Sequence, residues 1–157
     1  MKSVHNLLVA LILLTVILIS GCSNELSAAE KQLKENRDKW DRQSALFDRD
    51  YTYTIQIGCF CPEDIRAPVN VAVMDGKTYF VVYQEDGQPV TNDIFNRINS
   101  VENLFKIVQE AIDSEADKLT VEYDANLGYP KHISIDPIKD AVDEEHAYTI
   151  SDFAILK

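Results

Sequence analysis

The chain has 157 residues, a length that suits one domain better than two, and its 26 Asp and Glu residues against 15 Lys and Arg give a net charge of −11. A chain this acidic repels nucleic acid and anionic lipid headgroups, which excludes a protein that binds either of them through its surface. Removal of the first 21 residues would take away one Lys, leaving 14 basic against 26 acidic residues and a net charge of −12.

The N-terminus has the pattern of a secretory signal. Lys2 precedes an apolar run over residues 7–19, and the small residues Ser20 and Gly21 follow that run. The run is shorter than the roughly 20 residues that a membrane span needs, so the pattern predicts a cleaved signal peptide over residues 1–21. An uncleaved membrane anchor is the alternative.

The residues Ile19-Ser20-Gly21-Cys22 resemble the lipobox of bacterial lipoproteins. The resemblance implies an S-diacylglycerol and an N-palmitoyl group on Cys22, which would anchor the chain to a membrane in the cell envelope, with residues 22–26 as the lipidated tether. Ser23 stands where lipoproteins kept in the inner membrane often carry Asp. We therefore expect the outer membrane, on its periplasmic side, if the cell is Gram-negative.

Two helices are predicted in the remainder of the chain. Ser27 and Glu30 form a capping box before a helix that extends to about Asp48. The apolar residues of this helix recur every seven positions, at Leu33, Trp40 and Phe47. This stripe is too narrow for a coiled coil and predicts a helix that packs on its own domain. Ser100 can cap the second helix, whose apolar residues have helical spacing.

Six strands are predicted in two groups of three, over residues 51–61, 69–74, 77–84, 118–124, 131–136 and 147–155. Asp75-Gly76 predicts a tight hairpin, and the changing alternation near Ser151-Asp152 predicts a β-bulge. The order of helix, three strands, helix, three strands predicts an α+β domain over residues 27–157. We expect a two-layer fold, one antiparallel sheet with helices on one face, built as a tandem α-β-β-β repeat.

Several of these segments together resemble the DUF6174 family: Tyr51–Pro62, Leu104-Phe105, Gly128-Tyr129-Pro130, and Asp143-Glu144 with Ser151-Asp152-Phe153. The likeness extends from Trp40 to Phe153. It implies this fold and an exported setting, and it implies no reaction because the family has no assigned activity.

Cys59-Phe60-Cys61 is the pattern in the chain that most favours a reactive or metal-binding site. If Cys22 carries lipid, these two thiols remain in an oxidising compartment. A disulfide, two buried thiols, and a redox-active or Cu(I)-binding pair are the three open interpretations. Residues two apart on a strand have Cα atoms nearer 7 Å than the 5.5 Å usual for a disulfide. A disulfide therefore requires the chain to bend, which Gly58 and Pro62 permit.

No other pattern indicates catalysis or a cofactor. The chain has no G-x-S-x-G, no H-E-x-x-H and no Gly-rich phosphate loop. The acidic residues of one predicted loop are Asp136, Asp140, Asp143, Glu144 and Glu145. They lack the spacing of a Ca²⁺ loop, so we expect a solvated loop and no metal site.

The leading hypothesis is a lipid-anchored envelope lipoprotein with a non-catalytic binding or interaction domain, for which an envelope protein is one candidate partner and nucleic acid is not. The alternative is a thiol-based redox or copper-handling protein that uses Cys59 and Cys61.

Overall fold

A capped helix begins the part of the chain that the computed structural model describes, residues 27–156. The Ser27 hydroxyl accepts from the Glu30 N–H at 3.2 Å, and the Glu30 carboxylate accepts from the Ser27 N–H at 2.6 Å. The predicted capping box is therefore confirmed. Helix α2 runs over Ala28–Ser44, and the short 3-10 helix η1 (Ala45–Phe47) completes it before Asp48 turns the chain with a left-handed φ of 54°.

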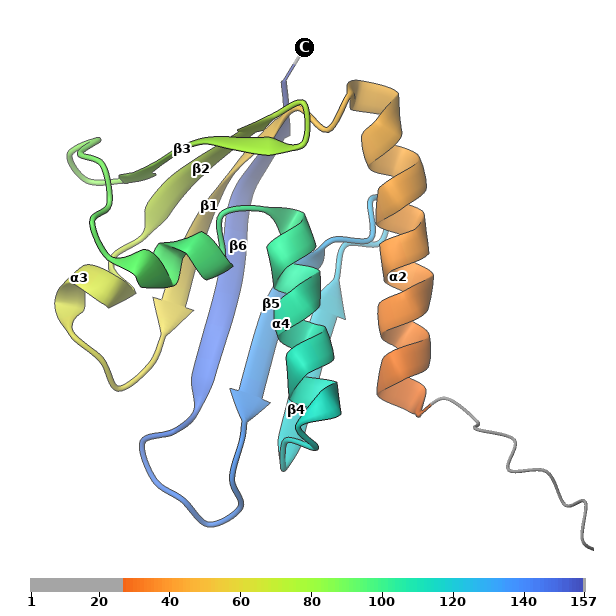
Figure 1. Cartoon of the computed structure of the whole chain (residues 1–157), viewed down its shortest axis with the longest axis vertical. Helices are drawn as coiled ribbons and strands as arrows, with labels where there is room; N and C mark the ends of the chain where they lie inside the picture. The colour runs from red at the N-terminus through yellow and green to blue at the C-terminus, as the bar shows by residue number, and fades with distance from the viewer. Residues whose placement is uncertain (1–26, 157) are drawn as a thin grey trace, which may run out of the picture.

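The six predicted strands form one antiparallel sheet in the order β3-β2-β1-β6-β5-β4. Their bounds are β1 Tyr51–Gly58, β2 Val69–Met74, β3 Lys77–Tyr83, β4 Lys118–Tyr123, β5 Pro130–Asp136 and β6 His146–Ile155. Each group of three strands is a meander, and the pairing of β1 with β6 joins the two groups (Figure 1). The predicted α+β class and the repeated order of elements are confirmed.

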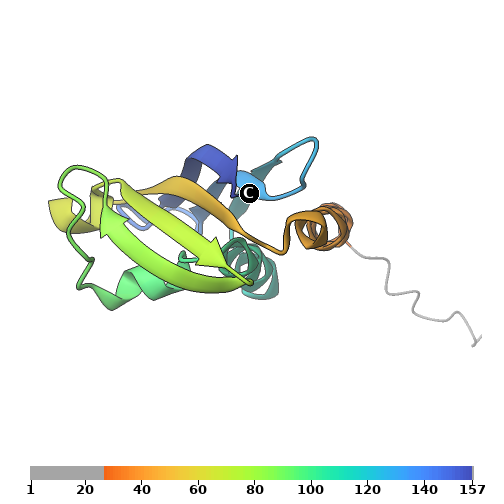
Figure 2. The same ribbon diagram turned by 90° about the horizontal axis from the view of Figure 1, so that it is seen from above.

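Both long helices lie on one face of this sheet (Figure 2). Helix α4 (Val101–Asp113) begins at its predicted cap, where the Ser100 hydroxyl accepts from the Asn103 N–H at 3.2 Å. Helices α2 and α4 contact each other, and α4 covers β4 and β5. Leu33 and Trp40 are buried as the heptad stripe of α2 predicts, so this helix packs on its own domain.

Two turns of the chain depend on residues with positive φ. Asp75 and Gly76 both have positive φ, 48° and 68°, as a tight hairpin between β2 and β3 requires. Gly128, with φ 86°, lies where the loop before β5 meets α2, and a Cβ there would stand 2.6 Å from the carbonyl oxygen of Asn36. Only glycine therefore fits at this contact between loop and helix.

The structure also corrects the sequence analysis. The first strand ends at Gly58, three residues earlier than its alternating pattern predicts, so Cys59 and Cys61 lie outside the sheet. Two short helical segments were not expected, α3 (Glu63–Arg66) and the 3-10 helix η2 (Asp93–Arg97). The predicted bulge is confirmed, since Thr54 pairs with Ser151 and Thr52 with Ala154.

Candidate functional site

The chain leaves the sheet after β1 in a short loop, residues 59–62, which we call the disulfide loop. Helix α3 follows and returns the chain to β2. Arg66 at the end of α3 fixes the turn, because its Nε donates to the Cys61 carbonyl oxygen at 3.0 Å. The carbonyl oxygen of Arg66 in turn accepts from Nε2 of Gln56 on β1 at 3.1 Å. Hydrogen bonds thus hold the loop at one end of the sheet.

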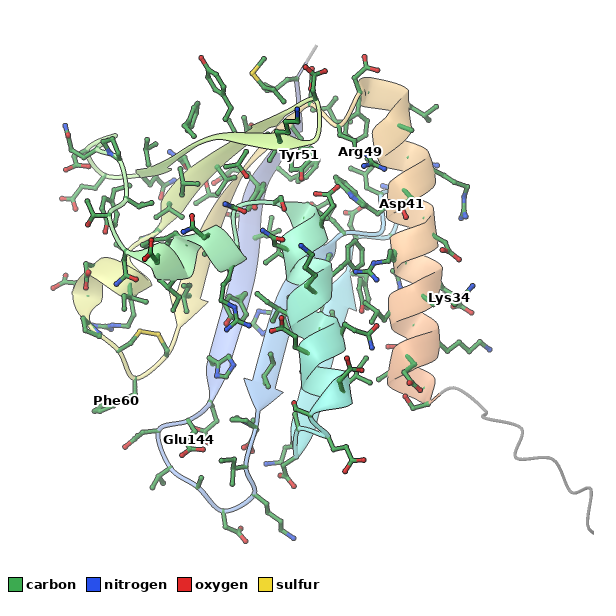
Figure 3. All side chains as sticks on the ribbon, in the orientation of Figure 1. Lys34, Asp41, Arg49, Tyr51, Phe60 and Glu144 are labelled. Atoms are coloured by element: carbon green, nitrogen blue, oxygen red, sulfur yellow. A yellow bond between two sulfur atoms is a disulfide. The ribbon has the colours of Figure 1, made fainter. Side chains whose placement is uncertain are left out.

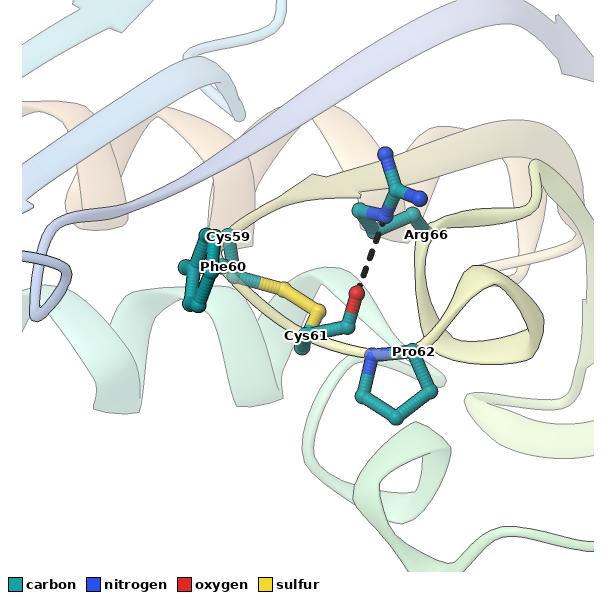
Figure 4. Close-up of a pocket in the computed structure, with 5 residues that line it drawn as sticks. All are labelled: Cys59, Phe60, Cys61, Pro62 and Arg66. Carbon is teal, nitrogen blue, oxygen red and sulfur yellow. Dashed lines mark hydrogen bonds between the residues drawn. A yellow bond between two sulfur atoms is a disulfide. The ribbon is translucent and has the colours of Figure 1, made fainter.

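Cys59 and Cys61 are joined by a disulfide, with their Cα atoms 5.3 Å apart (Figure 4). This distance falls in the range usual for disulfides and is shorter than the spacing of alternate residues on a strand. The bond is possible because the chain has already left β1. The structure thus has the two cysteines as a disulfide and not as two separate buried thiols, and a redox-active pair would also contain this bond in its oxidised form.

The two cysteines have different surroundings. Both are partly buried, but Cys59 packs against the hydrophobic core, whereas Cys61 follows the tip of the loop. Phe60 at that tip is 82% exposed and points away from the sheet (Figure 3). A hollow of about 410 Å³ lies beside the bond, lined by the four loop residues and Arg66. The loop therefore presents an aromatic ring, a disulfide and a cation on one small surface.

The structure does not gather the residues that a copper site would add to this pair. The ring of His132 hydrogen-bonds to Thr149 and that of His146 to the carbonyl oxygen of Glu144, while Met74 ends β2. Within residues 27–156, no group of three or more His, Cys, Asp and Glu side chains is placed to hold a metal ion.

The other end of β1 carries a buried polar network that sequence reasoning missed. The Glu102 carboxylate accepts from Trp40 Nε1 and from the Tyr51 hydroxyl, both at 3.1 Å. The Tyr51 hydroxyl also accepts from the Val101 N–H at 3.1 Å. Burial, and next the charge of Glu102, raise the pKa of Tyr51 far above its usual value. Every polar atom in the network has a partner, so the network ties α2, β1 and α4 together and leaves no group free for chemistry.

A polar cleft between α4 and the sheet was also not expected. It measures about 240 Å³ and is lined in part by Arg97, Glu110, His146 and Tyr148. Arg97 and Glu110 form an ion pair, and burial raises the pKa of the Tyr148 hydroxyl. In the sequence, the placement of His146 and Tyr148 two residues apart, and so on one face of a strand, was the signal that could have indicated this cleft. Because its two charges neutralise each other, the cleft offers no unpaired charge to a ligand.

The acidic residues around this loop have different surroundings. Asp136 ends β5 and pairs with Lys118 at 2.7 Å, whereas Glu144 is exposed in the loop before β6. Asp140 and Asp143 stand at positive φ, 61° and 68°, in a loop that is exposed over most of its length. The structure has here the solvated loop that the spacing predicts.

The predicted lipid attachment at Cys22 lies outside the described residues, as do the signal peptide and the tether. Within residues 27–156, no helix combines the length and the apolar composition needed to cross a bilayer.

A family model described as a family of unknown function, DUF6174, matches residues 32–155. The match takes in all six strands, α4 and the disulfide loop. Comparison with curated proteins and with solved structures gives no match.

Proposed function

We propose that this chain, which belongs to the DUF6174 family of unknown function, is a lipid-anchored domain of the cell envelope that acts by binding a protein partner. The lipid on Cys22 would hold the chain at the membrane, and the disulfide loop would make the contact with the partner.

The observation that carries this proposal is Phe60. Phe60 is 82% exposed, as exposed as any large apolar side chain within residues 27–156, and the disulfide between its two neighbours constrains its backbone. Aromatic side chains that are fixed before binding contribute strongly to protein interfaces, since little conformational freedom is lost when they are buried. The partner that fits has an apolar pocket for one aromatic ring.

The position of the loop also bears on the proposal. Helix α2 starts at the same end of the domain as the disulfide loop; in Figure 1 both lie toward the bottom, the loop at the left of the sheet and the helix at the right. Residues 22–26 could extend about 17 Å at most between a lipid on Cys22 and that end. A lipid anchor would thus keep Phe60 near the membrane. The partner is therefore expected among proteins embedded in the membrane or lying on it.

Two matched variants of the full-length chain test the partner proposal. Phe60→Ser and Leu46→Ser each remove a large apolar side chain, 82% and 79% exposed, and Leu46 lies at the far end of α2. Cells carrying a tagged chain are treated with a crosslinker, and proteins joined to it are quantified by mass spectrometry. We expect a partner whose recovery falls about 30-fold with Phe60→Ser, as for an interface hot spot, and not with Leu46→Ser. Equal recovery from both variants, or no joined protein at all, would contradict the proposal.

The anchor has its own test. Cys22→Ala should abolish labelling by a fatty-acid analogue and leave a precursor that still carries residues 1–21. A normally processed, lipid-labelled Cys22→Ala protein would rule out the lipoprotein assignment.

Thiol chemistry is the second candidate function. The observation that favours it is that the disulfide borders an open hollow and a guanidinium group. Copper handling would need at least one further ligand from a partner or from outside residues 27–156.

A further inference from the structure

We propose that the Cys59–Cys61 disulfide exchanges with the thiols of a dithiol protein, and that the incoming thiolate attacks Sγ of Cys61 and expels Cys59. The proposal rests on the second candidate function above and adds the substrate class, the attacked sulfur and a role for Arg66.

A structural role accounts poorly for this bond. Both cysteines lie in one short loop, so the bond joins no two elements of the fold. The closed loop has three residues, and a loop this short removes little entropy from the unfolded chain. The hydrogen bonds of Arg66 already fix the turn. The sheet therefore does not depend on this bond, which is free to take part in thiol–disulfide exchange.

The two sulfurs differ in access. A thiolate attacks a disulfide along the line of the S–S bond, from beyond the sulfur that it strikes, and the rate depends on which sulfur can be reached. Both cysteines are partly buried, and both border the hollow (Figure 4). Cys59 also packs against the hydrophobic core, whereas Cys61 stands beyond Phe60, farther along the loop. Attack from solvent thus reaches Cys61 and leaves the sulfur of Cys59 to depart.

Arg66 supplies a positive charge beside the disulfide loop. Its Nε hydrogen bond to the Cys61 carbonyl oxygen holds the guanidinium beside the loop, and within residues 27–156 no carboxylate lies within ion-pair distance of it. A neighbouring cation favours the thiolate over the thiol and so favours both the leaving group and the reduced form of the pair.

The exchange balances without any further reagent. One thiolate of the partner bonds to Cys61 Sγ as the S–S bond breaks, and Cys59 leaves as a thiolate that takes a proton from water. The second partner thiol, deprotonated, then attacks the partner sulfur of the mixed disulfide and releases Cys61 as a thiolate. The partner loses two electrons and two protons and gains a disulfide, while Cys59 and Cys61 become two thiols.

The first test compares the folded protein with a peptide of the same sequence. Full-length protein, purified in detergent, and a synthetic peptide of residues 56–66 in its disulfide form are each incubated with reduced glutathione. Free thiols are trapped with an alkylating reagent and read by mass on the fragment that contains positions 59 and 61. We expect the protein to be reduced at least as fast as the peptide, since the loop borders an open hollow and the fold holds Arg66 beside it. Reduction at least tenfold slower in the protein would overturn the proposal, because the fold would then be shielding the bond.

The second test identifies the attacked sulfur. Cys59→Ser leaves Cys61 as the thiol of the loop, and Cys61→Ser leaves Cys59; each variant is incubated with oxidised glutathione. The mixed disulfide should form about tenfold faster on Cys61 than on Cys59, since forward and reverse exchange pass through the same geometry. Adding Arg66→Gln to Cys59→Ser should slow the reaction of Cys61. Equal rates on the two cysteines would contradict the assignment of the attacked sulfur.

These measurements are separable from the partner proposal. Slow reduction together with recovery of a partner that depends on Phe60 would remove the exchange and keep the binding domain. Fast exchange without any such partner would keep the thiol exchange and remove the binding domain.

Discussion

The two ends of strand β1 are built in opposite ways. At its start, Tyr51 is fully buried, and its ring stacks on Phe153 and meets the edge of Trp40. At its end, Gly58 leads into the disulfide loop, where Phe60 has no such neighbours and is mostly exposed. The eight residues from Tyr51 to Gly58 form one strand in the middle of the sheet.

This difference indicates that one end of β1 stabilises the fold and the other end contacts other molecules. Every aromatic ring at the packed end touches another ring, and each polar atom of the Trp40–Tyr51–Glu102 network has a partner. Such an arrangement specifies one structure and resists substitution. The loop end has a single small covalent ring, and its apolar side chain faces solvent. Changes at the packed end should therefore lower the free energy of unfolding, and changes at the loop end should alter binding or exchange.

The largest effect is expected from Trp40→Ala. Trp40 is fully buried and meets the edges of four aromatic rings, so its loss leaves a cavity where α2 joins the sheet. The free energy of unfolding should fall by about 3–5 kcal/mol. The matched change at the loop end, Phe60→Ala, should alter it by no more than about 0.5 kcal/mol. Chemical denaturation of both variants measures the difference, and comparable losses would remove the contrast between the two ends.

A smaller effect is expected from Tyr51→Phe. The ring stays, but the Val101 N–H and one oxygen of Glu102 lose their partner. Leaving buried polar groups unpaired should cost about 1–3 kcal/mol in the same assay. A neutral result would mean that water replaces the hydroxyl and that the network adds little to stability.

Alkaline pH should destabilise the packed end. Burial, followed by the charge of Asp124, raises the pKa of Tyr129 to about 12, whereas tyrosine in the unfolded chain ionises near about 10. Between these values the unfolded state loses a proton that the folded state keeps, so the free energy of unfolding falls as the pH rises from about 10 to 12. Below about pH 10, the contribution of the protonated Tyr129 to the free energy of unfolding is fully present. In Tyr129→Phe the decline over this range should be shallower, and an unchanged decline would show that other groups cause it.

At the loop end, losing both cysteines should also have only a small effect on stability. A closed loop of three residues contributes about 1–2 kcal/mol through chain entropy, as an upper figure. Cys59→Ser with Cys61→Ser should therefore fold, with at most that loss in the free energy of unfolding. A loss near that of Trp40→Ala would mean that the disulfide is a structural support of the sheet.

The same contrast explains what could be predicted from the sequence. The capping box at Ser27, the Asp75-Gly76 turn and the bulge at Asp152 depend on residues close together in the chain, and all three are confirmed. The alternation of strand residues gave the element order and hence the fold class. These features follow from local geometry and periodicity.

What the sequence could not give depends on contacts between distant residues. Glu102 lies 62 residues from Trp40 and 51 from Tyr51, so nothing local indicated that all three meet. The end of β1 was placed too late because Cys59 and Cys61 continue the alternation of β1 after the chain has left the sheet. Arg66 reaches Cys61 only because α3, itself not predicted, turns the chain back. The candidate site was therefore half predicted, with its cysteines identified and its cation missed.

We propose that the loop end of β1, and not the packed end, makes the contact with a partner. Photocrosslinking can decide this, with one photoreactive aromatic amino acid placed in turn at Leu46, Phe60 and Tyr79 of the full-length chain in its own cells. All three side chains are at least 70% exposed, and only Phe60 lies in the disulfide loop. We expect a discrete crosslinked product from position 60 and none above background from positions 46 and 79. Products from position 46 or 79 without one from position 60 would contradict it.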